Sequence, residues 1–260
     1  MFNDIYRLEV LWQPSSRSIM PKRKKKYKRV LLKISGEAFC PENSSGIDDA
    51  KFASIASEIK DARNTGVEIA IVVGGGNILR GAILSRSGVD RTRADQLGMI
   101  ATVINAIILQ DSLKKLKIPA CVLSAIQIQN IVEPYSVQKC LNCLKEGYVV
   151  VIAGGTGNPY FTTDTGAALR AIEIEADIFL KGTKVDGVYS DDPLTHQNAK
   201  KYIKLKYMDV LEKKLGVIDS TAISLSMENN LPIIVFNLKR KHNIKKAVTG
   251  SKIGTYIGNN

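Results

Sequence analysis

The chain has 260 residues, of which 45% are hydrophobic and 24% charged, and this composition fits one large domain or two small ones with a substantial core. No run of about 18 consecutive apolar residues occurs, which argues against a membrane span. The four cysteines are too few for a disulfide framework and indicate a reducing, cytoplasmic compartment. Cys140 and Cys143 form a lone C-x-x-C pair without the partners of a zinc site. We expect both on one half-buried helix, with metal or redox use as the alternative.

The net charge of +12 is concentrated near the N-terminus. Residues 1–29 hold nine Lys or Arg and two acids, so they carry +7 and the other 231 residues carry +5. The basic run 22–29 is typical of a solvated tail, and polyanion binding is the alternative, although no nucleic-acid module is recognisable. Residues 1–19 lack a hydrophobic targeting region, and Met20 is a second plausible start. We therefore expect a basic, disordered extension over 1–28 and a single domain over 29–260.

From residue 29 onward, strand-like and helix-like patterns alternate. In chain order we predict a strand at 30–34, a helix at 49–64, a strand at 67–73, a helix at 92–116, a strand at 120–124, a helix at 136–145, a strand at 148–153, a helix at 164–175, a strand at 177–181, a helix at 219–229, and strands at 232–236 and 255–257. This alternation predicts an α/β fold with a mostly parallel sheet and helices on both faces. The helix at 92–116 is apolar on two sides, which indicates burial in the domain or contact with another subunit.

Glycine-rich turns follow three of the predicted strands, at 36, 74–76 and 154–157. Ligands of parallel sheets bind at the carboxyl ends of the strands, so we expect these turns to share one crevice with Lys33, Arg80 and the 182–193 loop. Backbone N–H groups in such turns bind anions, and lysine and arginine add positive charge. The pattern favours phosphoryl transfer, with Mg²⁺ held mainly by phosphate oxygens and water. Each turn alone is also explained as an ordinary connection, and Asp164 alone as a helix cap.

Three stretches resemble the amino acid kinase family: KISGE at 33–37, VGGGN at 73–77 and TKVDGVYSDDP at 183–193. Within that family, GTGNPYFTTD at 155–164, together with Arg80 and Asp95, is similar to the bacterial uridylate kinases. The similarity covers about residues 28–257. It implies a three-layer α/β/α sandwich with an acceptor lobe near 29–176 and an ATP lobe near 177–260. It also implies reversible transfer of the ATP γ-phosphoryl group to UMP, giving UDP and ADP in pyrimidine nucleotide biosynthesis, by a homohexamer.

The same resemblance implies roles for individual residues. Lys33 would neutralise the transferring phosphoryl group, and Asp164 would orient Lys33. Asp95 would accept ribose hydroxyls, because a carboxylate facing phosphates is repelled. The residues implied for UMP are Gly75, Arg80, Asp95, Thr156, Gly157, Asn158, Pro159, Tyr160, Phe161, Thr162 and Thr163. Those implied for ATP are Lys33, Ile34, Ser35, Gly36, Gly76, Arg80, Thr183, Tyr189 and Asp192, and no side chain is implied as a metal ligand.

Two positions depart from the bacterial members. Residues 40–46 read CPENSSG where many members have a glycine-rich insert implicated in GTP activation, and Gln110 stands where some carry arginine. GTP activation and feedback by UTP are therefore left open. Two other functions are weighed: a kinase of glutamate, aspartate or carbamate, weakened by the absence of an extra regulatory domain, and a non-catalytic nucleic-acid binder that uses the run 22–29.

Overall fold

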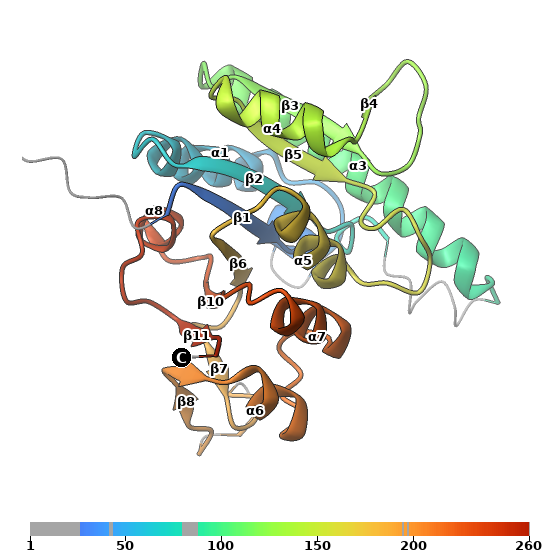
Figure 1. Cartoon of the computed structure of the whole chain (residues 1–260). Helices are drawn as coiled ribbons and strands as arrows, with labels where there is room; N and C mark the ends of the chain where they lie inside the picture. Colours follow the sequence, from blue (N-terminus) through green and yellow to red (C-terminus); the bar gives the residue numbers. More distant parts are fainter. Residues whose placement is uncertain (1–26, 42–43, 80–87, 194, 197, 260) are drawn as a thin grey trace, which may run out of the picture.

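The structure is a computed structural model and describes residues 27–41, 44–79, 88–193, 195, 196 and 198–259. The expectations for residues 1–26 and for Arg80 lie outside these described residues. With the labels of Figure 1, the elements are β1 (Arg29–Ile34), η1 (Gly36–Phe39), α1 (Asp49–Arg63), β2 (Glu68–Val73), α3 (Arg91–Lys115), β3 (Ala120–Ser124), β4 (Glu133–Pro134), α4 (Val137–Lys145), β5 (Val149–Ala153), α5 (Thr163–Glu173), β6 (Ile178–Thr183), β7 (Val188–Tyr189), β8 (Lys201–Tyr202), β9 (Lys204–Leu205), α6 (Tyr207–Glu212), α7 (Ser220–Glu228), β10 (Ile233–Asn237), α8 (Asn243–Val248) and β11 (Thr255–Ile257).

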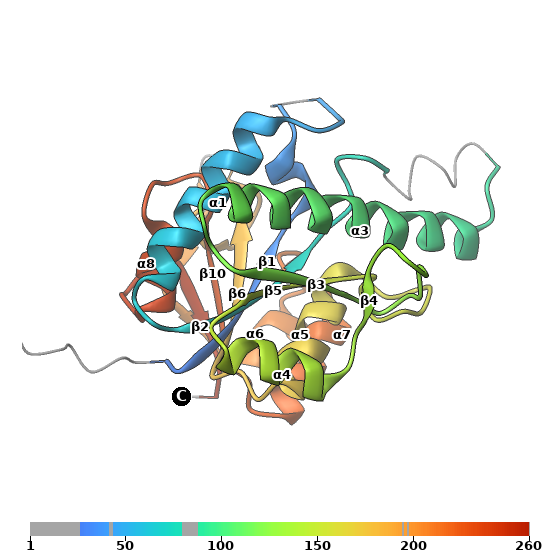
Figure 2. The same ribbon diagram turned by 90° about the horizontal axis from the view of Figure 1, so that it is seen from above.

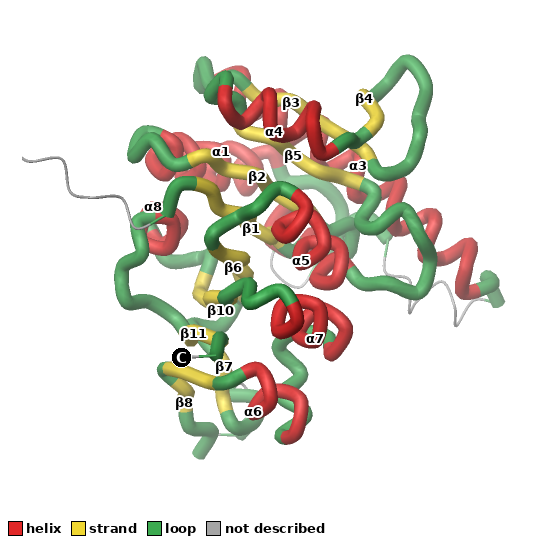
Figure 3. The backbone as a smooth tube through the Cα atoms, in the orientation of Figure 1, coloured by secondary structure: helices red, strands yellow, loops and turns green. Residues whose placement is uncertain are grey.

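One large sheet forms the centre of the molecule (Figures 1 and 3). Its nine described strands follow the order β4-β3-β5-β2-β1-β6-β10-β11-β9. All neighbouring pairs are parallel except β10 and β11, and β7 and β8 form a separate antiparallel pair. The predicted α/β fold with a mostly parallel sheet is confirmed.

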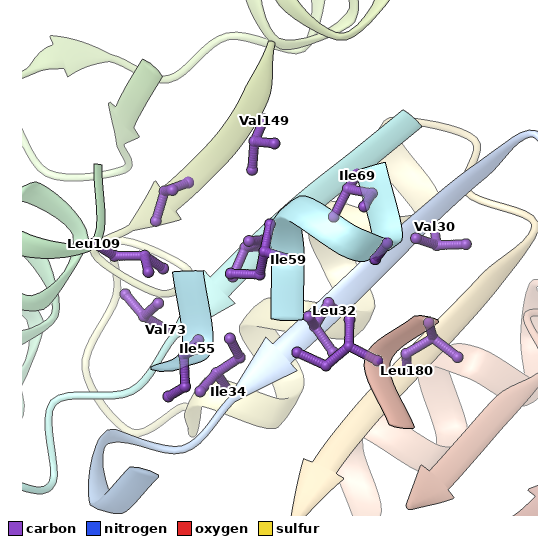
Figure 4. Packing of buried hydrophobic residues seen from close by; sticks show 14 of the residues in the cluster. Val30, Leu32, Ile34, Ile55, Ile59, Ile69, Val73, Leu109, Val149 and Leu180 are labelled. Carbon is purple, nitrogen blue, oxygen red and sulfur yellow. The ribbon is translucent and has the colours of Figure 1, made fainter. Parts of the chain in front are cut away.

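Helices cover both faces of this sheet, with α1, α3 and α8 on one side and α4, α5 and α7 on the other (Figure 2). The side chains of β1 alternate between the two cores: Leu32 and Ile34 pack with the first group, as Figure 4 shows, and Leu31 packs with the second. Successive strand residues point to opposite faces, so Lys33 shares the face of Leu31. The polar end of β1 is therefore directed toward α5.

The longer elements lie where the sequence predicts them, with bounds that differ by at most two residues. The prediction missed η1, β4, the β7–β8 pair, β9, α6 and α8. These elements have two to six residues, which is too short for a repeating apolar pattern. Their position depends on the segments against which they pack.

Helix α3 has one buried side and one exposed apolar side. It buries Leu109 and Leu113 against the sheet, while Leu97, Ile100 and Ile104 are 38%, 44% and 38% exposed. Within the described part of the chain, it is the one helix that length and composition alone would allow to cross a membrane. Helix α3 packs on α1, β3 and β5, so the apolar residues on its buried side belong to the protein core. The other apolar residues form the exposed stripe.

Candidate active site

The turns predicted to share a crevice follow four strands that are neighbours in the sheet. The order β5-β2-β1-β6 places the carboxyl ends of these strands at one edge. Ile34 is paired with Val73, and Lys33 with Lys181, across the central strands. The glycine turns after β1, β2 and β5 and the loop after β6 therefore begin at the same edge, which is where parallel sheets bind their ligands.

A carboxylate held between two lysines lies at this edge. Nζ of Lys33, at the end of β1, is 3.0 Å from Oδ1 of Asp164, and Nζ of Lys181 on β6 donates a short hydrogen bond to Oδ2. Lys181 also donates to the backbone carbonyl of Val217. The three charged residues are 8% to 9% exposed. Two positive charges thus face one negative charge, which leaves a net positive charge in a nearly dry site.

The charges of this cluster change the pKa values of Asp164 and Lys181. Burial opposes ionisation of Asp164, but the ammonium groups of Lys33 and Lys181 outweigh it and hold the pKa of the carboxyl below its usual value. Burial lowers the pKa of Lys181, and the neighbouring carboxylate of Asp164 offsets part of that change. The carboxylate is therefore ionised at neutral pH, and it favours the charged form of Lys181.

Asp164 is placed by the first turn of α5. Thr162 caps this helix, because its hydroxyl accepts hydrogen bonds from the N–H groups of Asp164 and Thr165 at 3.0 and 3.3 Å. The hydroxyls of Thr162 and Thr165 in turn donate to the two carboxylate oxygens of Asp219, the N-cap of α7, at 2.6 and 2.8 Å. The capping alternative for Asp164 is wrong: Thr162 supplies the cap, and Asp164 is free to face the lysines.

The three glycines of the turn after β2 have different surroundings. A Cβ on Gly74 would lie 2.8 Å from the backbone nitrogen of Gly36, and a Cβ on Gly75 would lie 2.7 Å from the carbonyl oxygen of Gly98 in α3. A Cβ on Gly76 would meet nothing within 4 Å. The first two glycines are therefore required by the close approach of the protein's own backbone, and Gly76 faces open space at the strand ends.

The loop at 155–164, predicted to hold the acceptor, is fastened to α3. Tyr160 has a φ of 71°, an uncommon conformation for a residue with a side chain, and its N–H donates to Oδ2 of Asp95 at 2.8 Å. Arg91 donates to the same oxygen, Oδ2, at 3.0 Å. Within the described residues, the other carboxylate oxygen, Oδ1, accepts no hydrogen bond. Tyr160 and Phe161 are 65% and 49% exposed, so the loop presents two aromatic side chains to solvent.

The residues predicted for ATP differ in burial and in hydrogen bonding. Ile34 is fully buried, so its side chain cannot reach a ligand and only its backbone lies near the edge. The hydroxyl of Thr183 donates to the carbonyl of Val185 at 2.7 Å, and the hydroxyl of Tyr189 donates to Asp186, which also pairs with Lys201 at 2.9 Å. These contacts fold the loop after β6 on itself and pair it with Lys201 of β8.

Two cavities lie at the carboxyl edge, on opposite faces of the sheet. The smaller, about 570 Å³, is lined by Thr162, Thr163 and Asp164 and by the segment from α6 to α7. The larger, about 700 Å³, lies between η1, α1 and the loop before α8, on the face away from Asp164. Of the three residues of the charge cluster, Asp164 lines the smaller cavity, so this cavity lies beside the cluster.

Sequence reasoning missed two residues of this site. Lys181 is the last charged residue of an apolar strand, the same signal that identified Lys33, but no motif marked it. Asp219 precedes a helix and resembles an ordinary cap, and its second role, to anchor the α5 terminus, depends on contact between two helices. The remaining residues predicted for UMP and ATP stay predictions, and Arg80 lies outside the described residues.

The mostly parallel sheet carries glycine turns and a buried cluster of two lysines and one aspartate at its carboxyl edge, and groups of these kinds are suited to binding anions. The comparisons with known proteins agree. Residues 28–237 match the amino acid kinase family, and the chain belongs to that family.

Three solved structures similar to the chain are UMP or uridylate kinases. A UMP kinase from Bacillus anthracis is 36% identical, with a TM-score of 0.86 over 89% of this chain and 96% of that one. A UMP kinase from Ureaplasma parvum is also 36% identical, with a TM-score of 0.84 over 91% of this chain and 100% of that one. A uridylate kinase from Archaeoglobus fulgidus is 30% identical, with a TM-score of 0.68 over 88% of this chain and 99% of that one. The chain thus has the fold of these enzymes over nearly its whole length.

Proposed function

We propose that this protein is a UMP kinase, which transfers the γ-phosphoryl group of ATP to UMP and gives UDP and ADP. The observation that carries the proposal is the cluster of Lys33, Lys181 and Asp164 at the carboxyl edge. It is supported by the similarity to UMP kinases at 36% identity. This reaction belongs to pyrimidine nucleotide biosynthesis, and the free thiols of the four cysteines suit a cytoplasmic enzyme.

The cluster supplies charge neutralisation rather than a covalent intermediate. The transferring phosphoryl group spreads negative charge over its oxygens, and fixed positive groups in a dry site stabilise that charge. Lys33 and Lys181 provide the positive groups, and Asp164 holds both side chains in place through its two ion pairs. The N-terminus of the eleven-residue helix α5, at Thr163, adds the positive end of its dipole, while the N–H groups of Asp164 and Thr165 are already bonded to the Thr162 hydroxyl.

The two nucleotides would occupy opposite sides of this cluster. We assign UMP to the 155–164 loop, with Oδ1 of Asp95 accepting ribose hydroxyls and with Phe161 beside the base. We assign ATP to the side of Gly36, Gly76 and the loop after β6, where Tyr189 offers an aromatic face. Arg80 is assigned to the phosphates by the family resemblance alone.

Mg²⁺ would enter with ATP. No group of three or more His, Cys, Asp or Glu side chains gathers as a metal site within the described residues. The one carboxylate of the cluster, Asp164, is already neutralised by two lysines. These residues would suit a metal ion held mainly by phosphate oxygens and water, and such an ion would neutralise phosphate charge when bound.

We also propose that the protein assembles as a homohexamer through the exposed side of α3. Leu97, Ile100 and Ile104 lie at helical spacing on that side and form an apolar stripe that water would otherwise cover. Replacing Ile104 by lysine puts a charge into the stripe and should give smaller particles in analytical ultracentrifugation. An unchanged sedimentation coefficient would assign the contact to another surface.

An ADP-release assay with a panel of acceptors tests the reaction. UMP, CMP, AMP, glutamate and carbamate are each offered with ATP and Mg²⁺ to the full chain. Turnover of UMP is expected, and turnover of an amino acid or carbamate without turnover of UMP would support the acid-kinase alternative instead.

Gel shifts of RNA and DNA over a salt series test whether the basic run 22–29 binds polyanions, since such binding weakens steeply with salt.

A further inference from the structure

Helix α3 presents a row of polar and small residues to the two glycine turns of the site. Asp95, Gly98, Thr102 and Asn105 are separated by three, four and three residues, so they lie on one face of the helix. The exposed apolar residues, including Ile104, lie on the other face. Polar side chains inside an otherwise apolar helix need hydrogen-bond partners when they are buried.

Thr102 finds its partner in the turn after β5. The side chain is 5% exposed, and its hydroxyl accepts the N–H of Gly154 at 2.7 Å while it donates to the carbonyl of Met99 at 2.6 Å. Gly154 has a φ of 78° and begins the loop that leads to Tyr160. A buried hydrogen bond from a rigid helix thus sets where this loop starts.

Asn105 finds its partners in the turn after β2. It is fully buried, and its side-chain N–H group donates to the carbonyl of Gly74 at 2.8 Å and to Oδ1 of Asn77 at 2.7 Å. Asn77, 1% exposed, donates back to Oδ1 of Asn105 at 3.2 Å and to the carbonyl of Gly46 at 2.9 Å. This pair of side-chain amides closes both ends of the turn that contains Gly75 and Gly76.

Gly98 and Asp95 complete the row. The carbonyl of Gly98 is the atom that leaves no room for a Cβ on Gly75, and Asp95 holds the N–H of Tyr160. The same helix face therefore contacts the turn after β2 at two points and the 154–164 segment at two points. The turn after β2 and the 154–164 segment, which form the two walls of the proposed acceptor site, are therefore both held in place by α3.

We propose that Thr102 and Asn105 are positioning residues for phosphoryl transfer: neither touches a nucleotide, and each fixes the backbone of one glycine turn relative to the other. The proposal rests on the proposed function for its kinetic consequences. A displacement of about 1 Å at such a turn lowers the rate of a positioned reaction by roughly a hundredfold. The turns themselves are glycine-rich and have little side-chain packing of their own, so the helix must hold them.

The test for Thr102 compares Thr102→Val with Thr102→Ser in the full-length enzyme. Valine keeps the shape and removes the acceptor of the Gly154 N–H, and serine restores it. We expect Thr102→Val to raise the KM for UMP by roughly five- to tenfold, in line with loss of a buried hydrogen bond, with a smaller change in the KM for ATP. Thr102→Ser should return the KM for UMP to near the wild-type value.

The test for Asn105 uses Asn105→Leu, which removes both donors to the turn after β2. Here we expect kcat to fall by at least about tenfold, because the backbone groups of Gly75 and Gly76 lose their fixed position. The matched control is Gln110→Met on the same helix. Gln110 donates to the carbonyl of Ala120 at 2.9 Å, at the opposite end of the sheet, so its loss should change stability without changing the kinetic constants.

A readout without turnover separates this proposal from the proposed function. Hydrogen exchange of the amides at 154–158 should be faster in Thr102→Val than in the wild type and in Gln110→Met. Faster exchange in an enzyme that does not phosphorylate UMP would uphold the positioning role and refute the function. Equal exchange, or a lowered melting temperature with KM and kcat unchanged in both variants, would overturn the positioning role.

Discussion

Replacing Asp164 by asparagine is the sharpest test of the charge cluster. The substitution keeps the size of the side chain and removes the negative charge between Lys33 and Lys181. At the 3.0 Å separation of Lys33 and Asp164 and an effective dielectric constant of about 20, one such pair attracts by about 5 kcal/mol before desolvation is counted. Breaking a buried pair by removal of one partner costs about 3–5 kcal/mol in practice, because the other charge stays buried.

The variant should therefore lose both stability and activity. A loss of about 3 kcal/mol corresponds to a melting temperature roughly 6–12 °C lower for a chain of this size. We expect kcat to fall by at least about a hundredfold, since two fixed donors of the transition state lose their alignment. Asp111→Asn is the control: Asp111 is 62% exposed on α3 and pairs loosely with Lys114, so its loss should leave both quantities near wild type.

The pH dependence of the variant gives a further check with a definite sign. Burial lowers the pKa of Lys181, and the carboxylate of Asp164 opposes that change. Without the carboxylate the pKa of Lys181 falls further, so one lysine loses its proton at a lower pH than in the wild type. The residual kcat of Asp164→Asn should then rise as the pH is lowered. Wild-type stability and kcat, or a residual activity that does not increase toward acid pH, would refute the reasoning.

Three further changes have defined outcomes. Lys33→Ala should lower kcat by about a hundred- to a thousandfold with little change in the KM for UMP, as initial-rate kinetics would show, because it removes a donor that acts on the transition state. Asp95→Asn should chiefly raise the KM for UMP, and an unchanged KM would remove the ribose assignment. The pKa of Asp164 is lowered on folding, so this group stabilises the protein above its unfolded value of about 3.9 and the contribution disappears as the pH falls through the folded pKa. Urea unfolding between about pH 6 and 3 should therefore show a weaker pH dependence in Asp164→Asn than in the wild type.

Local patterns were enough to predict the main elements and part of the site. The helix at α1 and the strands at β1, β2 and β5 were predictable because their apolar residues repeat with the period of the element itself. The glycine turns and Lys33 were predictable because they directly follow buried strands, where a parallel sheet binds its ligands. The turn at 74–76 shows the limit of such reasoning: two of its glycines are required by contact with Gly36 and Gly98, and Gly76 alone faces open space.

The sequence by itself therefore determined the class of fold, the edge of the sheet that carries the site and the residues of its turns, since these follow from local periodicity and strand ends. Only the tertiary structure decided which side chains meet there. Lys181 faces Asp164 because β6 pairs with β1 in a register that aligns it with Lys33, and Thr102 and Asn105 reach the turns because α3 crosses the sheet above them. Strand order, register and helix placement come from contacts between residues far apart in the chain, and no local pattern specifies them.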